Sequence, residues 1–168
     1  RGREAAFEQA MRGAVQRLFP TLAGNPDYAA ILTERHLQRL HGLVDEARGQ
    51  GARVVPLAEA LSAGGLRQMA PTLVFDPAIG TRLMQEEIFG PVLPVLPCDS
   101  ADEAIAFINA RPRPLALYWF GRDVSARDRV LARTVSGGVT VNDTLMHIAH
   151  EHLPFGGVGE SGLGAYHG

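Results

Sequence analysis

The residues best suited to chemistry fall in three short segments of this 168-residue chain. They are an acidic turn at residues 86–91, a histidine cluster at residues 147–152 and a glycine-rich tail that starts at Pro154. The single cysteine, Cys98, is a fourth candidate because a thiolate is a strong nucleophile. Each of these features is compatible with a chemical role and with a purely structural one.

In the acidic turn, Glu86 and Glu87 stand side by side and Phe89 follows before Gly90 and Pro91. Binding residues concentrate in loops at strand ends, and a carboxylate in such a loop can accept hydrogen bonds from sugar hydroxyls. The aromatic ring could then pack on a flat cofactor. The plainer interpretation is a solvated acidic pair beside a buried Phe89, and the residues alone leave both interpretations open.

The glycine-rich tail contains a formal G-x-G-x-x-G pattern at Gly157, Gly159 and Gly162. A dinucleotide site needs a strand before this pattern and a helix after it, because the pyrophosphate sits on the helix N-terminus. Here Pro154 precedes the pattern and residues 165–168 supply no helix. We therefore expect a tightly turned loop whose glycines adopt positive φ and allow other backbone to pass closely.

The histidine cluster offers His147, His150 and His152 with Glu151, so a zinc site and a zinc hydrolase have to be considered. On a strand, His150 and His152 would share one face and His147 would lie on the other. No cysteine lies nearby to complete a tetrahedral set. We expect no metal site and expect these histidines to line a cleft or the surface.

Cys98 lies just before a predicted helix N-terminus, whose dipole can lower the pKa of a thiol. No histidine or lysine is adjacent to activate it, and cysteines are usually buried, so an inert structural thiol is the favoured interpretation. A lone cysteine allows no intrachain disulfide and indicates a reducing, cytoplasmic compartment. The chain begins without methionine and stops after a glycine-rich motif, so we expect a piece cut from a longer protein.

The composition is that of an ordinary globular protein, with 46% hydrophobic and 20% charged residues and a net charge of −2. No basic stripe and no apolar run of bilayer length occur, which argues against nucleic acid and membrane partners. All 16 basic residues are arginine, so Schiff-base enzymes and Walker-type phosphate loops are excluded because both need a lysine.

Apolar periodicity and turn residues predict alternating helices and strands over a length typical of one compact domain. The spacing of Ser100 and Glu103 predicts a reciprocal cap at one helix N-terminus. This order indicates an α/β fold with a largely parallel sheet covered by helices. The predicted helices are 4–19, 36–50, 100–110 and 125–133, with helix-prone 83–85, and the predicted strands are 54–55, 72–75, 92–96, 115–120 and 138–141.

Four motifs, in order along nearly the whole chain, resemble the aldehyde dehydrogenase superfamily, and their details are most similar to the class 3 branch that includes bacterial coniferyl aldehyde dehydrogenases. The resemblance implies that the chain is the C-terminal part of that family's catalytic domain. The motifs are Met-Gln-Glu-Glu-Ile-Phe-Gly-Pro-Val-Leu-Pro-Val at 84–95, Pro-Leu-Ala-Leu-Tyr at 114–118, Ser-Gly-Gly-Val with Asn-Asp at 136–143, and Leu-Pro-Phe-Gly-Gly-Val-Gly-Glu-Ser-Gly-Leu-Gly-Ala-Tyr-His-Gly at 153–168.

The resemblance also implies site residues. Glu87 would bind the hydroxyls of the nicotinamide ribose of NAD or NADP, and Phe89 would support the nicotinamide ring. Phe155 would line the aldehyde pocket, with Asn142 and His147 in the segment that approaches it. The acidic turn and the glycine-rich tail would then frame one cleft for nicotinamide and aldehyde.

The family's nucleophilic cysteine, in a Gly-Gln-x-Cys motif, and its general base, in a Glu-Leu-Gly-Gly motif, do not occur in this sequence. The resemblance places the cysteine and the NAD-binding domain upstream of residue 1, so residues 1–168 contain no catalytic residue and are expected to be inactive alone. By the resemblance, the whole enzyme would be a homodimer that oxidises an aldehyde, such as the aromatic coniferaldehyde, through a cysteine thiohemiacetal and hydride transfer. The alternative is a non-catalytic binding or interaction module derived from this fold.

Overall fold

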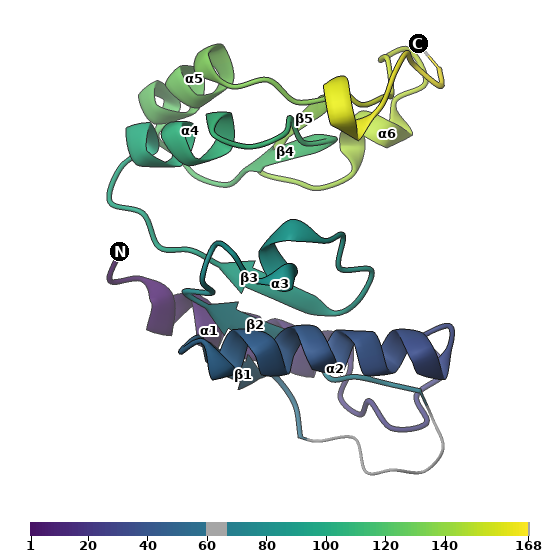
Figure 1. Cartoon of the computed structure of the whole chain (residues 1–168). Helices are drawn as coiled ribbons and strands as arrows, with labels where there is room; N and C mark the ends of the chain where they lie inside the picture. Colours follow the sequence, from purple (N-terminus) through teal and green to yellow (C-terminus); the bar gives the residue numbers. More distant parts are fainter. Residues whose placement is uncertain (60–66, 168) are drawn as a thin grey trace. The chain divides into compact units, whose positions relative to one another are not determined.

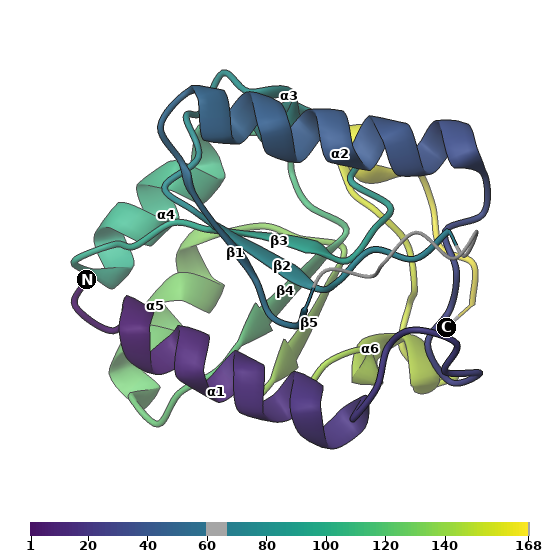
Figure 2. The same cartoon turned by 90° about the horizontal axis from the view of Figure 1, so that it is seen from below.

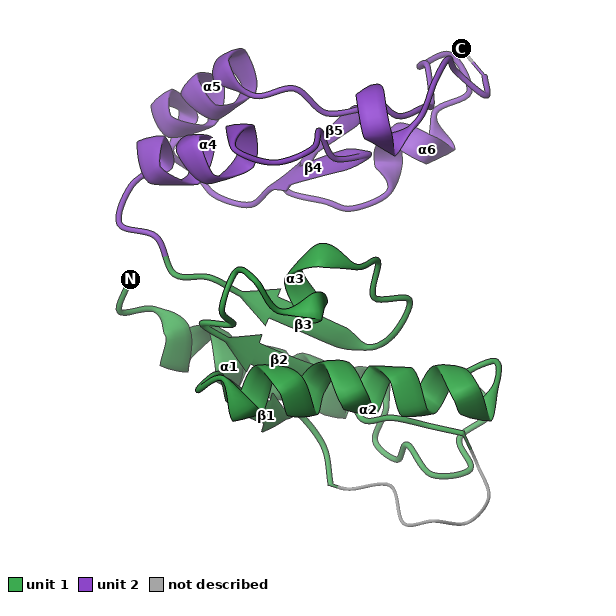
Figure 3. Ribbon diagram, viewed as in Figure 1, with its two compact units in different colours: residues 1–97 green, residues 98–168 purple. Residues whose placement is uncertain are grey.

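The computed structural model describes residues 1–59 and 67–167. The chain divides into two compact units, Arg1–Pro97 and Cys98–Gly168 (Figure 1; Figure 3). This differs from the single compact unit that the length suggests. No helix among the described residues combines the length and the apolar character needed to cross a bilayer.

Unit 1 is a three-stranded sheet with a long helix on each face. The strand order is β1-β2-β3, where β1 (Arg53–Pro56) is antiparallel to β2 (Thr72–Phe75) and β2 is parallel to β3 (Val92–Val95). Figure 2 shows α1 (Glu4–Leu18) on one side of this sheet and α2 (Glu34–Gly49) on the other. The short helix α3 (Arg82–Gln85) lies in the crossover between β2 and β3.

The central strand β2 explains the two cores of unit 1, because alternate side chains of a strand point to opposite faces. Leu73 and Phe75 pack in a cluster with Val15 of α1. Val74 belongs to the cluster on the other face, together with buried residues of α2. The α2 residues of that cluster are Leu37, Leu40, Leu43, Val44 and Ala47.

Unit 2 contains a parallel strand pair, β4 (Ala116–Trp119) and β5 (Gly138–Val141), joined through α5 (Val124–Arg133). Helix α4 (Ala101–Asn109) packs beside α5, and Ile105 and Val130 are buried. Two short elements follow, α6 (Met146–Ala149) and the 3-10 turn η1 (Gly159–Ser161).

The predicted α/β class is confirmed, and both β2–β3 and β4–β5 are parallel pairs. The exception is β1, which pairs antiparallel at the edge of its sheet, an arrangement common in mixed sheets. The predicted cap of α4 is confirmed for Ser100, while the Glu103 carboxylate reaches back to Asp99, the residue before the N-cap. Ser100 Oγ accepts from the amide of Glu103 at 3.1 Å, and the Glu103 carboxylate accepts from the amide of Asp99 at 2.7 Å.

Two local predictions need correction. Helix α2 starts two residues earlier than expected, because the Thr33 side chain caps it by accepting from the amide of His36 at 3.1 Å. The histidine cluster begins in a helix, α6, rather than on the strand that the spacing argument considered. Part of the segment between the first two predicted strands, residues 60–66, lies outside the described residues.

Candidate functional site

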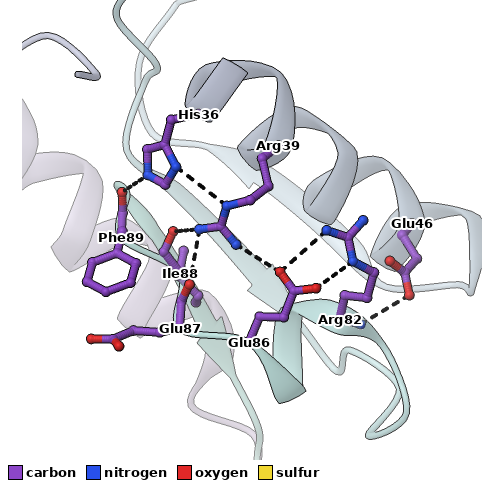
Figure 4. A network of polar contacts seen from close by, with 8 residues as sticks. All are labelled: His36, Arg39, Glu46, Arg82, Glu86, Glu87, Ile88 and Phe89. Carbon is purple, nitrogen blue, oxygen red and sulfur yellow. Dashed lines mark hydrogen bonds and ion pairs between the residues drawn. The ribbon is translucent and has the colours of Figure 1, made fainter. Parts of the chain in front are cut away.

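Helix α2 presents two polar side chains, His36 and Arg39, toward the acidic turn. They are three residues apart and therefore lie on the same side of the helix, one turn from each other. The Thr33 cap defines where this helix begins and so fixes which residues occupy its first turns. Figure 4 shows both side chains directed at the backbone of residues 87–89.

Three consecutive backbone carbonyls of the acidic turn accept hydrogen bonds from these two side chains. Arg39 Nη2 donates to the carbonyl of Glu87 at 3.0 Å and to that of Ile88 at 2.5 Å. His36 Nε2 lies 2.8 Å from the Phe89 carbonyl, which can only accept, so Nε2 carries the proton. We call these three contacts the carbonyl clamp. Because hydrogen bonds from a charged guanidinium are stronger than neutral ones, the clamp fixes the backbone of the turn.

Glu86 is held between two arginines and has a structural role. Its carboxylate accepts from Arg82 Nε at 2.7 Å and from Arg39 Nη1 at 2.9 Å. These hydrogen bonds, that from Arg82 first, lower the pKa of Glu86 below its usual value of 4.5, although desolvation opposes the shift. Glu46 of α2 accepts from the amide of Arg82 at 3.1 Å and so ties α3 to α2.

Glu87 and Phe89, in contrast, are presented outward. Within the described part of the chain, no hydrogen bond or ion pair engages the Glu87 carboxylate, which points away from the clamp in Figure 4. The Phe89 side chain is 66% exposed, so the interpretation of a buried phenylalanine is wrong. Phe89 adopts φ 49°, a strained conformation for a residue with a side chain, and its carbonyl is the one that His36 binds.

The glycine after Phe89 lets the turn approach α2. A Cβ at Gly90 would lie 2.6 Å from the methyl carbons of Leu40, a residue that is fully buried in the core. A larger residue at position 90 would therefore force either the turn or the buried Leu40 side chain to shift. The Glu87 carboxylate points outward without a partner among the described residues, and the exposed Phe89 ring follows two residues later. This pair suits a ligand that carries hydroxyl donors beside a flat ring. A nicotinamide riboside has both.

In unit 2, Asn142 has a backbone role at the carboxyl ends of β4 and β5. It adopts φ 57°, its amide donates to the Trp119 carbonyl at 2.7 Å, and its side-chain oxygen accepts from the amide of Gly121 at 2.8 Å. Asn142 thus joins the loops that leave the two strands.

His147 is buried, with 5% of its surface exposed, and it packs against the start of β5. Its Nδ1 lies 3.2 Å from Thr140 Oγ1, and its ring sits so close to Gly138 that a Cβ there would lie 2.3 Å from the ring. The Phe155 ring neighbours it at 5.9 Å between centroids. The structure therefore brings His147 and Phe155 together within unit 2, with Phe155 the more exposed of the two.

The glycine-rich tail is a tight loop, as predicted. Gly159, Gly162 and Gly164 adopt positive φ, and a Cβ at Gly156 would lie 2.0 Å from the Gly164 carbonyl oxygen. Only the three-residue turn η1 follows the start of the G-x-G-x-x-G pattern in the described chain. A dinucleotide-binding turn with its following helix is therefore not formed here.

The remaining candidates do not form a site. His150 and His152 are exposed with ring centroids 6.0 Å apart, while His147 is buried, so the three imidazoles do not converge. Across residues 1–59 and 67–167, no group of three His, Cys, Asp or Glu side chains could hold a metal. Cys98 is exposed, so the burial that its structural interpretation assumed is wrong.

The family assignment follows from comparison with known proteins. The sequence model of the aldehyde dehydrogenase family matches residues 3–168. The chain belongs to this family. A relative from Caulobacter vibrioides, named as a probable coniferyl aldehyde dehydrogenase, is 55% identical over 97% of the chain and 34% of its own length. A mouse relative, aldehyde dehydrogenase family 3 member A2, is 46% identical over 88% of the chain and 29% of its own length, in agreement with the class 3-like branch.

Solved structures agree with this fold. A mutant of aldehyde dehydrogenase C from Pseudomonas syringae, solved with NAD+ and octanal, matches with a TM-score of 0.82 and 26% identity over 100% of the chain and 35% of its own length. The chain spans about a third of the length of each relative that it matches.

Sequence reasoning missed the residues that support the site. The clamp residues His36 and Arg39 stand about 50 positions before the turn they hold, and a polar pair on a helix gives no signal of its partner. Thr140 and His167 were also missed as neighbours of His147 and Phe155. Glu87 belongs to unit 1 and Phe155 to unit 2, so their meeting in one cleft stays a prediction.

Proposed function

We propose that residues 1–168 are the C-terminal part of the catalytic domain of an NAD(P)-dependent aldehyde dehydrogenase. The complete protein would oxidise an aldehyde to a carboxylic acid. The single observation that carries this proposal within the chain is the carbonyl clamp, which leaves Glu87 and Phe89 free to face a ligand while Glu86 is bound by arginines. Family membership supports the same chemistry.

Each site residue then has a defined task. Glu87 accepts hydrogen bonds from the nicotinamide ribose, Phe89 supports the nicotinamide ring, and Phe155 lines the aldehyde pocket, with Asn142 and His147 behind it. A bound nicotinamide would supply the acceptor for the hydride that leaves the substrate carbon after nucleophilic attack. Glu87 exchanges no proton and contributes by orientation, because holding the ribose fixes the distance over which the hydride moves.

The nucleophilic cysteine, the general base and the NAD-binding domain are proposed to lie upstream of residue 1. Residues 1–168 alone would then be inactive, since the thiolate that attacks the aldehyde is missing. We further propose a cytoplasmic homodimer that acts on an aromatic aldehyde resembling coniferaldehyde, in line with the named activity of the Caulobacter relative. The position of the cysteine is tested by reading the gene upstream of Arg1. The absence of a Gly-Gln-x-Cys motif there would favour a non-catalytic module instead.

The role of Glu87 is tested by Glu87→Gln in the complete enzyme. Gln keeps the size of the side chain but loses the charge that strengthens hydrogen bonds from sugar hydroxyls. We expect single-turnover hydride transfer, followed by the absorbance of the reduced nicotinamide, to slow on the order of 10- to 100-fold, with unchanged thermal unfolding.

Glu86→Gln is the matched control, because it makes the same change on the neighbouring residue. It weakens the ion pairs to Arg82 and Arg39 and should lower the unfolding temperature while slowing hydride transfer less than Glu87→Gln does. A Glu87→Gln enzyme with the wild-type single-turnover rate would refute the proposed role of Glu87.

A further inference from the structure

We infer that His147, anchored by Thr140, is a positioning residue that holds the Phe155 ring in one orientation and thereby makes the pocket select flat aryl aldehydes over alkyl aldehydes. This inference rests on the proposed function, in which Phe155 lines the aldehyde pocket. It differs from a direct role for His147, because a side chain with only 5% of its surface exposed has little surface to offer a substrate.

His147 is anchored through its Nδ1 and its backbone amide, whereas its Nε2 is buried without a hydrogen-bond partner among the described residues. Thr140 Oγ1 lies 3.2 Å from His147 Nδ1 and also accepts from the His147 amide at 3.4 Å, so one hydroxyl fixes both the ring and the backbone at the start of α6. Thr140 is itself buried on β5. The missing side chain at Gly138 provides the space that the imidazole occupies against the strand.

The anchored imidazole of His147 is one of two rings that pack against the Phe155 ring. The centroid of the Phe155 ring lies 5.9 Å from that of the His147 ring and 5.9 Å from that of the His167 ring. The Phe155 and His167 rings are stacked, with 25° between their planes. The backbone around Phe155 is fixed as well, since its amide donates to the His167 carbonyl at 3.1 Å and its carbonyl accepts from the amide of Tyr166 at 2.6 Å. The Tyr118 ring also packs against His147, with 5.8 Å between the ring centroids.

This arrangement predicts a preference for flat substrates. Phe155 remains partly exposed and offers a ring whose orientation is set by its neighbours. Aromatic pairs depend on relative ring orientation, whereas a flexible alkyl chain can adapt to a ring in many orientations. Releasing Phe155 should therefore weaken binding of an aryl aldehyde more than binding of an alkyl aldehyde.

The experiment compares His147→Ala with wild type in the complete enzyme, with cinnamaldehyde and hexanal as substrates. We expect KM for cinnamaldehyde to rise about 10-fold, near the upper limit for one aromatic pair, with a rise of less than about 3-fold for hexanal and little change in kcat for either. Binding of cinnamate, measured by calorimetry without cofactor, should weaken in parallel. Thr140→Val should act in the same direction, Thr140→Ser should restore wild-type values, and His150→Ala should change nothing.

A double-mutant cycle decides whether His147 acts through Phe155. In a Phe155→Ala background, His147→Ala should have no further effect on KM for cinnamaldehyde. An equal KM rise for both aldehydes, or an undiminished effect of His147→Ala in that background, would overturn the inference. If Phe155→Ala itself leaves both KM values unchanged, the proposed function of Phe155 fails instead. The Thr140 variants keep the test informative if His147→Ala does not fold.

Discussion

Two adjacent glutamates in this chain differ because of their neighbours. Glu86 accepts from Arg82 and Arg39, whereas the Glu87 carboxylate has no hydrogen-bonding partner within the described residues. The same side-chain type therefore serves as a structural anchor at one position and as an available acceptor at the next. A pattern of residue types could name the pair, but only the placement of the two arginines separates the roles.

The environment of Glu86 predicts a pH dependence of stability. Its pKa is lowered in the folded state by the hydrogen bond from Arg82 and then that from Arg39, so folding favours the ionised form. The stabilisation is therefore fully present above its usual pKa of 4.5 and is lost as pH falls through the lower folded value.

The measurement is chemical denaturation of wild type and Glu86→Gln between about pH 3 and pH 7, since Gln does not titrate over this range. The wild type should be the more stable protein near neutral pH, and the difference should shrink as Glu86 becomes protonated. A difference that stays constant down to about pH 3 would show that the ionised carboxylate does not contribute.

At the scale of elements, α2 does two things at once. Its apolar face, with Leu40 fully buried, packs on the sheet of unit 1, and its polar residues His36 and Arg39 hold the acidic turn. The conformation of the cofactor-facing turn thus depends on a helix that is distant in sequence. Phe89 has a strained φ, and its carbonyl is bound by His36 of the clamp, which helps to hold this conformation.

Removing the arginine of the clamp should affect both stability and catalysis. Arg39→Met keeps the aliphatic length but removes the donors to Glu86 and to the carbonyls of Glu87 and Ile88. We expect a loss of about 1–2 kcal/mol in the free energy of unfolding, because the arginine is only partly screened by solvent, together with slower hydride transfer in the complete enzyme.

Arg48→Met on the same helix is the matched control. Arg48 is exposed and pairs only with Asp45 one turn earlier among the described contacts, so its loss should cost less than about 0.5 kcal/mol and leave hydride transfer unchanged. Equal effects of the two substitutions would argue against a specific clamp.

At the scale of the whole molecule, the proposed function requires Glu87 of unit 1 and Phe155 of unit 2 to serve one cleft. In the complete enzyme, nicotinamide and an inert carboxylate such as cinnamate should then bind at the same time and in contact. Interligand nuclear Overhauser effects between nicotinamide and cinnamate protons would report this contact. Glu87→Gln should weaken nicotinamide binding more than cinnamate binding, and Phe155→Ala should weaken cinnamate binding more than nicotinamide binding. Simultaneous binding without interligand effects would place the two ligands in separate sites.

Local patterns in the sequence were sufficient for most of the elements and for the family. The strands at residues 72–75 and 138–141 follow from side-chain periodicity, and the Ser100 cap of α4 follows from a hydrogen bond between near neighbours. The strand at residues 54–55 was also predicted, but its antiparallel pairing was not, because the direction in which a strand pairs is set by packing and not by its own residues.

Which site residues are available to a ligand and which act as supports depends on packing between distant segments. Phe89 faces outward, His147 turns inward onto Thr140, and Arg39 reaches across to a turn 47 to 49 residues away. The physical reason is that exposure and hydrogen-bond partners arise when distant segments pack together. A residue's type fixes what it can donate or accept, and the fold fixes to which atom it does so.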